Sequence, residues 1–139
     1  MAFERSDVII RQRLRETAML LALIMLSACQ IGTKISVNTV NGTSVFTVTR
    51  VDGDETCVQS IEVREGNGEI GKTVHWAIVQ SMAEIQSGKA VCTNVFTYGL
   101  PVSGFEQVVG AKPLTPGASY TVSIGGAGLT GSAYFTVPR

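Results

Sequence analysis

One histidine, three cysteines and a group of carboxylates are the residues of this 139-residue chain that could do chemistry. His75 is the first candidate for general acid–base work, but no serine or cysteine has the sequence context of an activated nucleophile. His75 stands beside Trp76 in an apolar, strand-like segment, so the two side chains should face in opposite directions. We therefore expect His75 to be structural or solvent-facing, and we expect neither catalytic residues nor enzyme activity.

The carboxylates gather in the segment "VDGDET", which contains Asp52, Asp54 and Glu55. Alternating carboxylates can converge on a hard cation such as Ca²⁺, although no glutamate closes this segment as it would a complete calcium loop. A solvated turn between strands is the alternative, and we favour it. The glycine-rich "GGAGLTG" lacks the Lys-Ser/Thr pair and the helix of a phosphate-binding loop. The sequence therefore predicts no metal and no cofactor.

Overall composition bounds the class of protein further. Eleven basic and eleven acidic residues cancel, which leaves no electrostatic footprint for nucleic acid. An apolar content of 45% is enough for one packed core, and the length is that of a single domain. We expect no nucleic-acid partner and no second globular domain.

The N-terminal segment 1–28 has the layout of a helical secretory signal peptide. Its first part is rich in arginine, whereas residues 17–28 carry no charge. As a helix this uncharged stretch would reach only about 18 Å, well short of the roughly 30 Å hydrocarbon core. It is therefore a poor permanent membrane span.

The uncharged stretch ends in Leu26, Ser27, Ala28 and Cys29, which resemble the lipobox of bacterial lipoproteins in type and order. The resemblance implies that diacylglycerol is attached to the Cys29 thiol, that the chain is cut before Cys29, and that the new amino group receives a fatty acid such as palmitate. Two or three acyl chains make a durable anchor in the lipid bilayer. The alternatives are an ordinary signal peptide with an accidental cysteine and a buried helix of a cytosolic protein.

Residue 30 bears on the expected location. In Gram-negative lipoproteins an aspartate after the lipidated cysteine is the usual signal for retention in the inner membrane, and this chain has Gln30. The resemblance therefore implies the outer membrane of the cell envelope, with the domain facing the periplasm. A Gram-positive cell-surface lipoprotein is the alternative.

Cys57 and Cys92 are the two cysteines that remain if Cys29 carries lipid. An even number in an oxidising compartment predicts a disulfide, and two separate buried thiols are the alternative. Closing a loop of this length should stabilise the fold by roughly 3 to 4 kcal/mol in the chain-entropy model.

The chain after Cys29 alternates between short strand patterns and turn residues. "NG" at positions 41 and 42 predicts a hairpin, "SYTVSI" and "SAYFTV" predict another, and Ser81, Glu84 and Gly88 are typical of a short capped helix. We expect a lipidated N-terminus and short tether over 29–34 and an all-β domain over 35–139, a small antiparallel β-sandwich.

The segment from Leu114 to Val122, "LTPGASYTV", is similar to the Leu-x-Pro-Gly-x-x-Tyr-x-Val stretch of fibronectin type III domains. The resemblance implies an immunoglobulin-like or fibronectin-like sandwich. In it Tyr120 would begin the penultimate strand and return its hydroxyl to upstream backbone, and Trp76 would lie in the core. An immunoglobulin disulfide would need a cysteine at Val122, so Cys57 and Cys92 should bridge other strands.

The loop "YGLPVSGF" is the candidate partner contact, through Tyr98, Leu100, Pro101 and Phe105. Such side chains can expose apolar surface to a partner, and they can also close one end of a sandwich core. We expect a membrane-anchored accessory module that binds a protein of an envelope assembly. The alternative is a periplasmic inhibitor lipoprotein that blocks a hydrolase such as lysozyme through a projecting loop.

Overall fold

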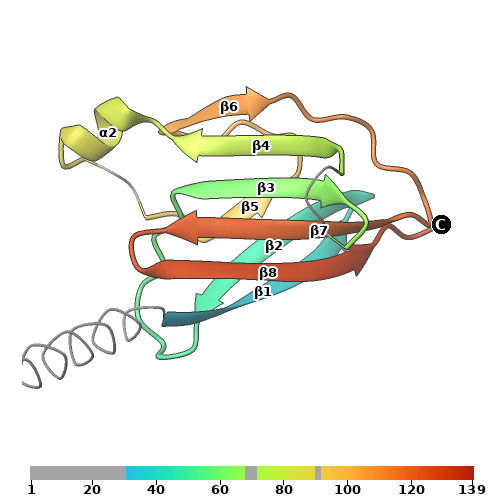
Figure 1. Ribbon diagram of the computed structural model, residues 1–139, viewed down its shortest axis with the longest axis horizontal. Coiled ribbons are helices and arrows are strands. Elements are labelled where there is room, and N and C mark those ends of the chain that lie inside the picture. The colour runs from blue at the N-terminus through green and yellow to red at the C-terminus, as the bar shows by residue number, and fades with distance from the viewer. Residues whose placement is uncertain (1–30, 68–71, 90–91) are drawn as a thin grey trace, which may run out of the picture. The chain divides into compact units, whose positions relative to one another are not determined.

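A computed structural model describes residues 31–67, 72–89 and 92–139, and this part of the chain is almost entirely β-structure (Figure 1). The expected signal peptide, the lipobox and Cys29 lie outside the described residues. The elements are β1 (Ile31–Val40), β2 (Thr43–Arg50), β3 (Ser60–Glu65), β4 (Val74–Gln80), α2 (Met82–Gln86), β5 (Val95–Thr97), β6 (Phe105–Val109), β7 (Ser119–Gly126) and β8 (Leu129–Thr136). The first strand begins within the predicted tether segment 29–34.

The eight strands form one curled sheet in the order β5-β2-β1-β8-β7-β3-β4-β6. The sheet folds over so that β1, β2 and β5 pass behind β3 and β7 (Figure 1). Neighbouring strands are antiparallel except β1 and β8, which pair in parallel at Ile31–Leu129 and Gly32–Thr130. The predicted all-β, sandwich-like class is confirmed, and the short parallel pair is its departure from a purely antiparallel arrangement.

The folded-over half of the sheet (β1, β2 and β5) and the other half (β3, β4, β6, β7 and β8) enclose an aromatic core. Phe46 and Val48 alternate with less buried neighbours along β2, as a strand with one core-facing side requires. The Phe46 ring lies 6.4 Å from Trp76 of β4 and 5.5 Å from Phe135 of β8, so side chains from both halves meet. Trp76 is fully buried, as predicted.

Turn residues fix the hairpin between β1 and β2. Val40 pairs with Thr43, which leaves Asn41 and Gly42 as the loop, with φ of 50° and 79°. Two positive φ angles are the requirement of the type I′ turn, whose twist matches that of the strands. The hairpin predicted from "NG" is confirmed.

A glycine permits the close approach of β1 to β8. A Cβ at Gly131 would overlap the hydroxyl oxygen of Thr33, which donates a hydrogen bond to the Thr130 carbonyl oxygen at 2.7 Å. The missing side chain therefore allows the parallel contact that closes the sheet.

The tyrosine corner predicted from the fibronectin resemblance is present. Tyr120 lies near the start of β7 with 1% of its surface exposed. Its hydroxyl oxygen accepts a hydrogen bond of 3.0 Å from the backbone N–H of Thr115, five residues upstream. This bond ties the incoming loop to the core.

The short helix predicted after β4 is also present, but its predicted capping box is not formed. Ser81 is the N-cap residue, yet its side chain makes no capping hydrogen bond. Gly88 follows the helix with φ of 68°, the left-handed conformation usual after a C-terminus. No helix in the described part of the chain has the length and apolar character to cross a membrane.

Candidate functional site

A groove opens between the two halves of the sheet at the end where β8 finishes, near the C-terminus marked in Figure 1. We call it the end groove, and its volume is about 430 Å³. Its walls come from four separate parts of the chain: the β1–β2 turn, the residue after β5, the loop before β7 and the residues after β8. The lining residues are Gly42, Thr43, Ser44, Tyr98, Pro113, Leu114, Pro116, Val137 and Pro138.

Tyr98 holds the two sides of the end groove together. Its backbone N–H donates to the Ser44 carbonyl at 2.9 Å, which fixes it to the β2 side. Its hydroxyl donates to the Lys112 carbonyl at 2.7 Å and lies 3.2 Å from the His75 carbonyl, on the β4 side. The Tyr98 ring is therefore immobilised and can serve as a preformed apolar surface.

The protonation state of Tyr98 suits this role. Burial raises its pKa to about 12, with the nearby Tyr120 as a smaller cause. The hydroxyl is therefore neutral and remains a donor throughout the physiological range.

The outer wall of the groove is braced by backbone hydrogen bonds. The Gly117 N–H donates to the Val137 carbonyl at 2.8 Å, and the Val137 N–H donates to the Ala118 carbonyl at 3.0 Å. The tyrosine corner holds Thr115 between the lining residues Pro113 and Pro116. These bonds extend the β7–β8 pairing past the strands, so the wall is part of the rigid fold.

Prolines and aliphatic side chains form one part of the groove lining, which also includes the hydroxyl residues Thr43 and Ser44. Pro113, Pro116 and Pro138 have no backbone N–H, and Leu114 and Val137 contribute only aliphatic side chains. This proline-rich part of the lining favours contact with an apolar group, because a polar group packed against it would lose hydrogen bonds to water.

Two exposed cations flank the groove. Lys112 precedes the lining residue Pro113, and Arg139 follows the lining residue Pro138. The Arg139 side chain lies over Gly117, with its Nε 2.9 Å from where a Cβ of residue 117 would be. Among the described residues, ion pairs to carboxylates involve Arg50 and Arg64 and leave both flanking cations unpaired.

The structure divides the predicted partner loop into two kinds of residue. Tyr98 and Phe105 pack against the core, and the Phe105 ring lies 5.6 Å from that of Phe96. Leu100 and Pro101 are exposed. The four residues therefore do not form one exposed patch, and only Tyr98 lines the end groove. Sequence reasoning missed the other lining residues, for which the proline spacing over 113–116 was the available signal.

His75 lies at this end of β4 in a structural setting. Its ring packs edge-on against Tyr120 at 5.0 Å, and its carbonyl accepts from the Lys112 N–H at 2.9 Å. His75 does not line the end groove. The residue helps to position the loop that carries Lys112.

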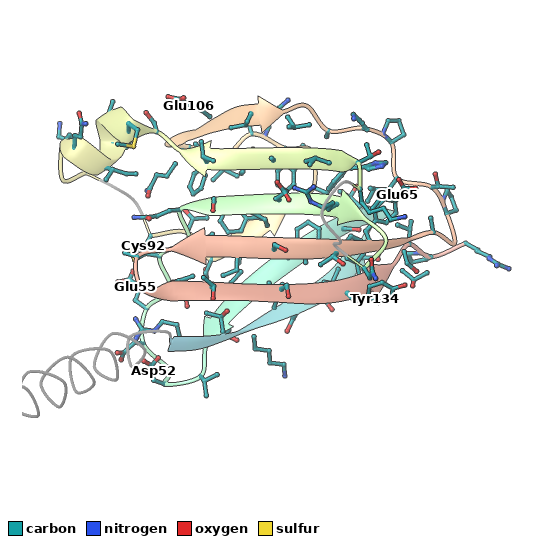
Figure 2. All side chains as sticks on the ribbon, in the orientation of Figure 1. Asp52, Glu55, Glu65, Cys92, Glu106 and Tyr134 are labelled. Atoms are coloured by element: carbon teal, nitrogen blue, oxygen red, sulfur yellow. A yellow bond between two sulfur atoms is a disulfide. The ribbon has the colours of Figure 1, made fainter. Side chains whose placement is uncertain are left out.

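The opposite end of the domain carries the acidic turn and the disulfide; we call it the α2 end. Figure 2 shows Asp52, Glu55 and Cys92 there, with Glu65 at the groove end. Cys57 and Cys92 are bonded, which confirms the predicted pair, and they join the coil before β3 to the coil before β5. The prediction that they bridge two strands is wrong in this detail.

Arg50 pairs with two of the three carboxylates of the acidic turn. Arg50 donates from Nε to Asp52 at 2.9 Å and also contacts Asp54 at 3.7 Å. This hydrogen bond from Arg50 holds the pKa of Asp52 below its ordinary value. This arrangement favours a solvated turn over a calcium loop. Arg50 is already paired with Asp52, which would be the first carboxylate ligand of a bound cation.

A second feature beside the turn could suggest a metal site. The Glu55 carboxylate and the sulfur atoms of Cys57 and Cys92 lie within 4.8 Å of one another. Both sulfurs are bonded in the disulfide, so neither is a thiolate ligand.

Comparisons of this chain with protein-family models, with curated proteins and with solved structures gave no match.

Proposed function

We propose that this protein is a bacterial envelope lipoprotein, anchored in the outer membrane through Cys29, whose domain binds another envelope protein at the end groove. It is a non-enzymatic accessory module of an envelope assembly. The observation that carries the proposal is a rigid groove with a proline-rich wall at the end of the domain opposite to the start of β1.

The position of the groove fits an anchor at Cys29. Only Gln30 separates Cys29 from Ile31, the first residue of β1, so the lipid attachment lies within roughly 7 Å of the strand. The strand has 10 residues and would span about 33 Å. The α2 end therefore faces the bilayer, and the end groove faces away from it, where a partner protein has access.

The same geometry makes an assembly role a better fit than a hydrolase inhibitor. An inhibitor would need a rigid loop that projects into an active site. Gly126 pairs with Leu129, so the glycine-rich hairpin ends in the short tip formed by Ala127 and Gly128. The loop after β5 is held against the core by Tyr98 and Phe105. Neither segment has the form that an inhibitor requires.

Substitution of the anchor residue tests the first part of the proposal. We expect Cys29→Ala to lack the acyl mass and to leave the membrane fraction, measured by mass spectrometry and by fractionation of cells. The double variant Cys57→Ser/Cys92→Ser is the matched control, since it removes the other cysteines and should stay lipidated. A Cys29→Ala protein that is processed normally and remains with membranes would show that the lipobox interpretation is wrong.

A further inference from the structure

Strands β1 and β8 are neighbours in the sheet order, yet they pair only at the first two residues of each strand. This short pair is the parallel exception in an otherwise antiparallel sheet. Beyond it β8 continues beside β7, whereas β1 passes behind with β2 (Figure 1). Among the described residues, no strand pairs with the other side of β1 from Ile35 to Val40. We call this stretch the free edge of β1.

Regular alternation along β1 determines which backbone groups point to the free edge. The Val51 N–H donates to the Gly32 carbonyl at 3.0 Å, so the backbone groups of Gly32 face the β2 side. In an antiparallel pair alternate residues bond to the neighbouring strand, and the N–H and C=O groups of the residues between them point away from it. The register with β2 is continuous, so these groups of Ile35, Val37 and Thr39 point to the free edge. Such a row of donors and acceptors is a template for another extended backbone.

The free edge of β1 lacks the features that protect the two outermost strands of the sheet. Natural edge strands are usually short, charged, bulged or interrupted by proline. β5 has 3 residues, and β6 has 5 residues, the exposed Glu106 and an irregularity in its pairing with β4. Residues 35–40 form a longer edge that contains neither charge nor proline and pairs regularly with β2. This edge is therefore open to strand pairing.

We infer that the partner protein contributes an extended segment, which adds to the free edge of β1 as a further strand. The inference rests on the proposed protein-binding function and specifies the form of the partner at the same interface. The β1–β2 turn follows the free edge directly, and Gly42 and Thr43 of this turn region line the end groove. A segment that enters across the groove therefore runs antiparallel to β1, which is the slightly more stable kind of pairing.

The neighbouring side chains indicate which residues the segment carries. Val37 packs against the core but is only half-buried. A residue of the added strand directly opposite Val37 would point to the same face, where an apolar side chain would cover it. β8 also has a free edge, but its core-facing Ala133 is small and its Phe135 is already buried. We therefore expect a segment of alternating apolar and polar residues, paired with β1.

A second copy of this chain is a poorer occupant of the free edge. Two copies anchored in one bilayer through Cys29 would both direct β1 away from that bilayer. Identical strands related by a two-fold axis can pair only when they are antiparallel, because parallel hydrogen bonds need residues that are offset between the strands. A symmetric dimer through this edge would therefore need its two anchors at opposite ends.

Peptides with selectively methylated backbones test strand addition directly. The probe is a labelled peptide of alternating valine and threonine flanked by lysines, and the protein is the full lipidated form in detergent micelles. N-methylation of the valines removes the N–H groups that would face β1, whereas N-methylation of the threonines removes those on the other side. We expect fluorescence polarisation to show that the threonine-methylated peptide binds like the unmodified peptide. The valine-methylated peptide should bind at least about tenfold more weakly. No saturable binding of the unmodified peptide, or equal weakening by both modifications, would overturn the inference.

Proline substitutions locate the added strand on the protein. Thr39 is exposed and its N–H points to the free edge, so Thr39→Pro removes that donor and leaves the pairing with β2. Ser132→Pro is the matched control. The Val137 N–H bonds to the Ala118 carbonyl, so alternation directs the Ser132 N–H to the free side of β8. We expect Thr39→Pro to weaken the unmodified peptide by at least about fivefold and Ser132→Pro to leave its affinity unchanged, with thermal unfolding showing that both variants fold. The reverse result would place the segment on β8 and contradict the inference.

Two further measurements separate the inference from its alternatives. Self-association in micelles that Thr39→Pro abolishes would assign the free edge to a second copy and refute the inference. A photoreactive amino acid at Leu114 tests the proposed function separately, because it reports from the end groove in the native envelope. A protein adduct at Leu114 with no difference between the two methylated peptides would retain the function and refute strand addition. Selective peptide binding without a protein adduct at Leu114 would support strand addition and contradict the end groove as the partner site.

Discussion

Replacing Tyr98 with phenylalanine tests whether one hydroxyl ties the two sides of the end groove. Tyr98→Phe keeps the ring but removes the donor to the Lys112 carbonyl at 2.7 Å and the contact with the His75 carbonyl at 3.2 Å. The Lys112 carbonyl lies at the surface and can be rehydrated, so the expected loss is that of one ordinary hydrogen bond, about 1 kcal/mol. For a domain of this size that corresponds to a decrease in Tm of about 4 °C.

The pH dependence of the same variant gives a second measurement. The pKa of Tyr98 is raised from an ordinary 10.0 to about 12, because burial favours the neutral hydroxyl. The neutral hydroxyl therefore contributes its full stabilisation below pH 10, and this contribution is lost as the pH rises from 10 to 12. We expect the difference in unfolding free energy between the wild type and Tyr98→Phe to narrow over that interval in urea titrations.

Tyr134→Phe is the matched control for this prediction. Tyr134 lies on β8 with 63% of its surface exposed, so loss of its hydroxyl should change stability by less than about 0.5 kcal/mol at any pH. Two results would contradict the prediction: Tyr98→Phe as stable as Tyr134→Phe, or a loss of unfolding free energy that is unchanged from pH 9 to pH 12. In either case the Tyr98 hydroxyl does not tie the two sides of the groove.

Two further predictions concern closure of the fold. The Cys57–Cys92 bond spans a sequence separation of 35, so the double serine variant should lose about 4 kcal/mol of unfolding free energy in urea; a loss below about 1 kcal/mol would contradict the loop-entropy argument. Gly131→Val should cost about 2 kcal/mol, because its side chain would overlap the Thr33 hydroxyl. Adding Thr33→Ala should recover part of that loss in thermal unfolding, and no recovery would place the strain elsewhere.

Local sequence signals predicted the parts of the fold that neighbouring residues determine. The "NG" pair favours positive φ angles and predicted the β1–β2 hairpin. The spacing from Leu114 to Tyr120 predicted the tyrosine corner. The even number of cysteines after Cys29 predicted the disulfide. These features depend on turn residues, on the alternation of side chains along a strand or on the number of cysteines, all of which can be seen in the sequence.

The features that sequence reasoning missed depend on contacts between distant segments. The parallel pairing of β1 with β8 requires the small volume of Gly131, which looked only like part of a hairpin loop. The end groove combines the β1–β2 turn with residues near positions 98, 115 and 138, and no single pattern contains them. Ser81 and Glu84 fit a capping-box pattern, yet the short helix forms without the Ser81 capping bond.

Site-specific photo-cross-linking in intact cells tests the central claim most directly. A photoreactive amino acid is placed at Leu114 in the end groove and, as a control, at the exposed Tyr134 on the outer face of β8. The proposal predicts that irradiation of the membrane-anchored protein gives a discrete protein adduct from position 114 and none from position 134. Adducts from position 134 alone, or lipid as the only species attached at position 114, would contradict the claim that the end groove binds an envelope protein.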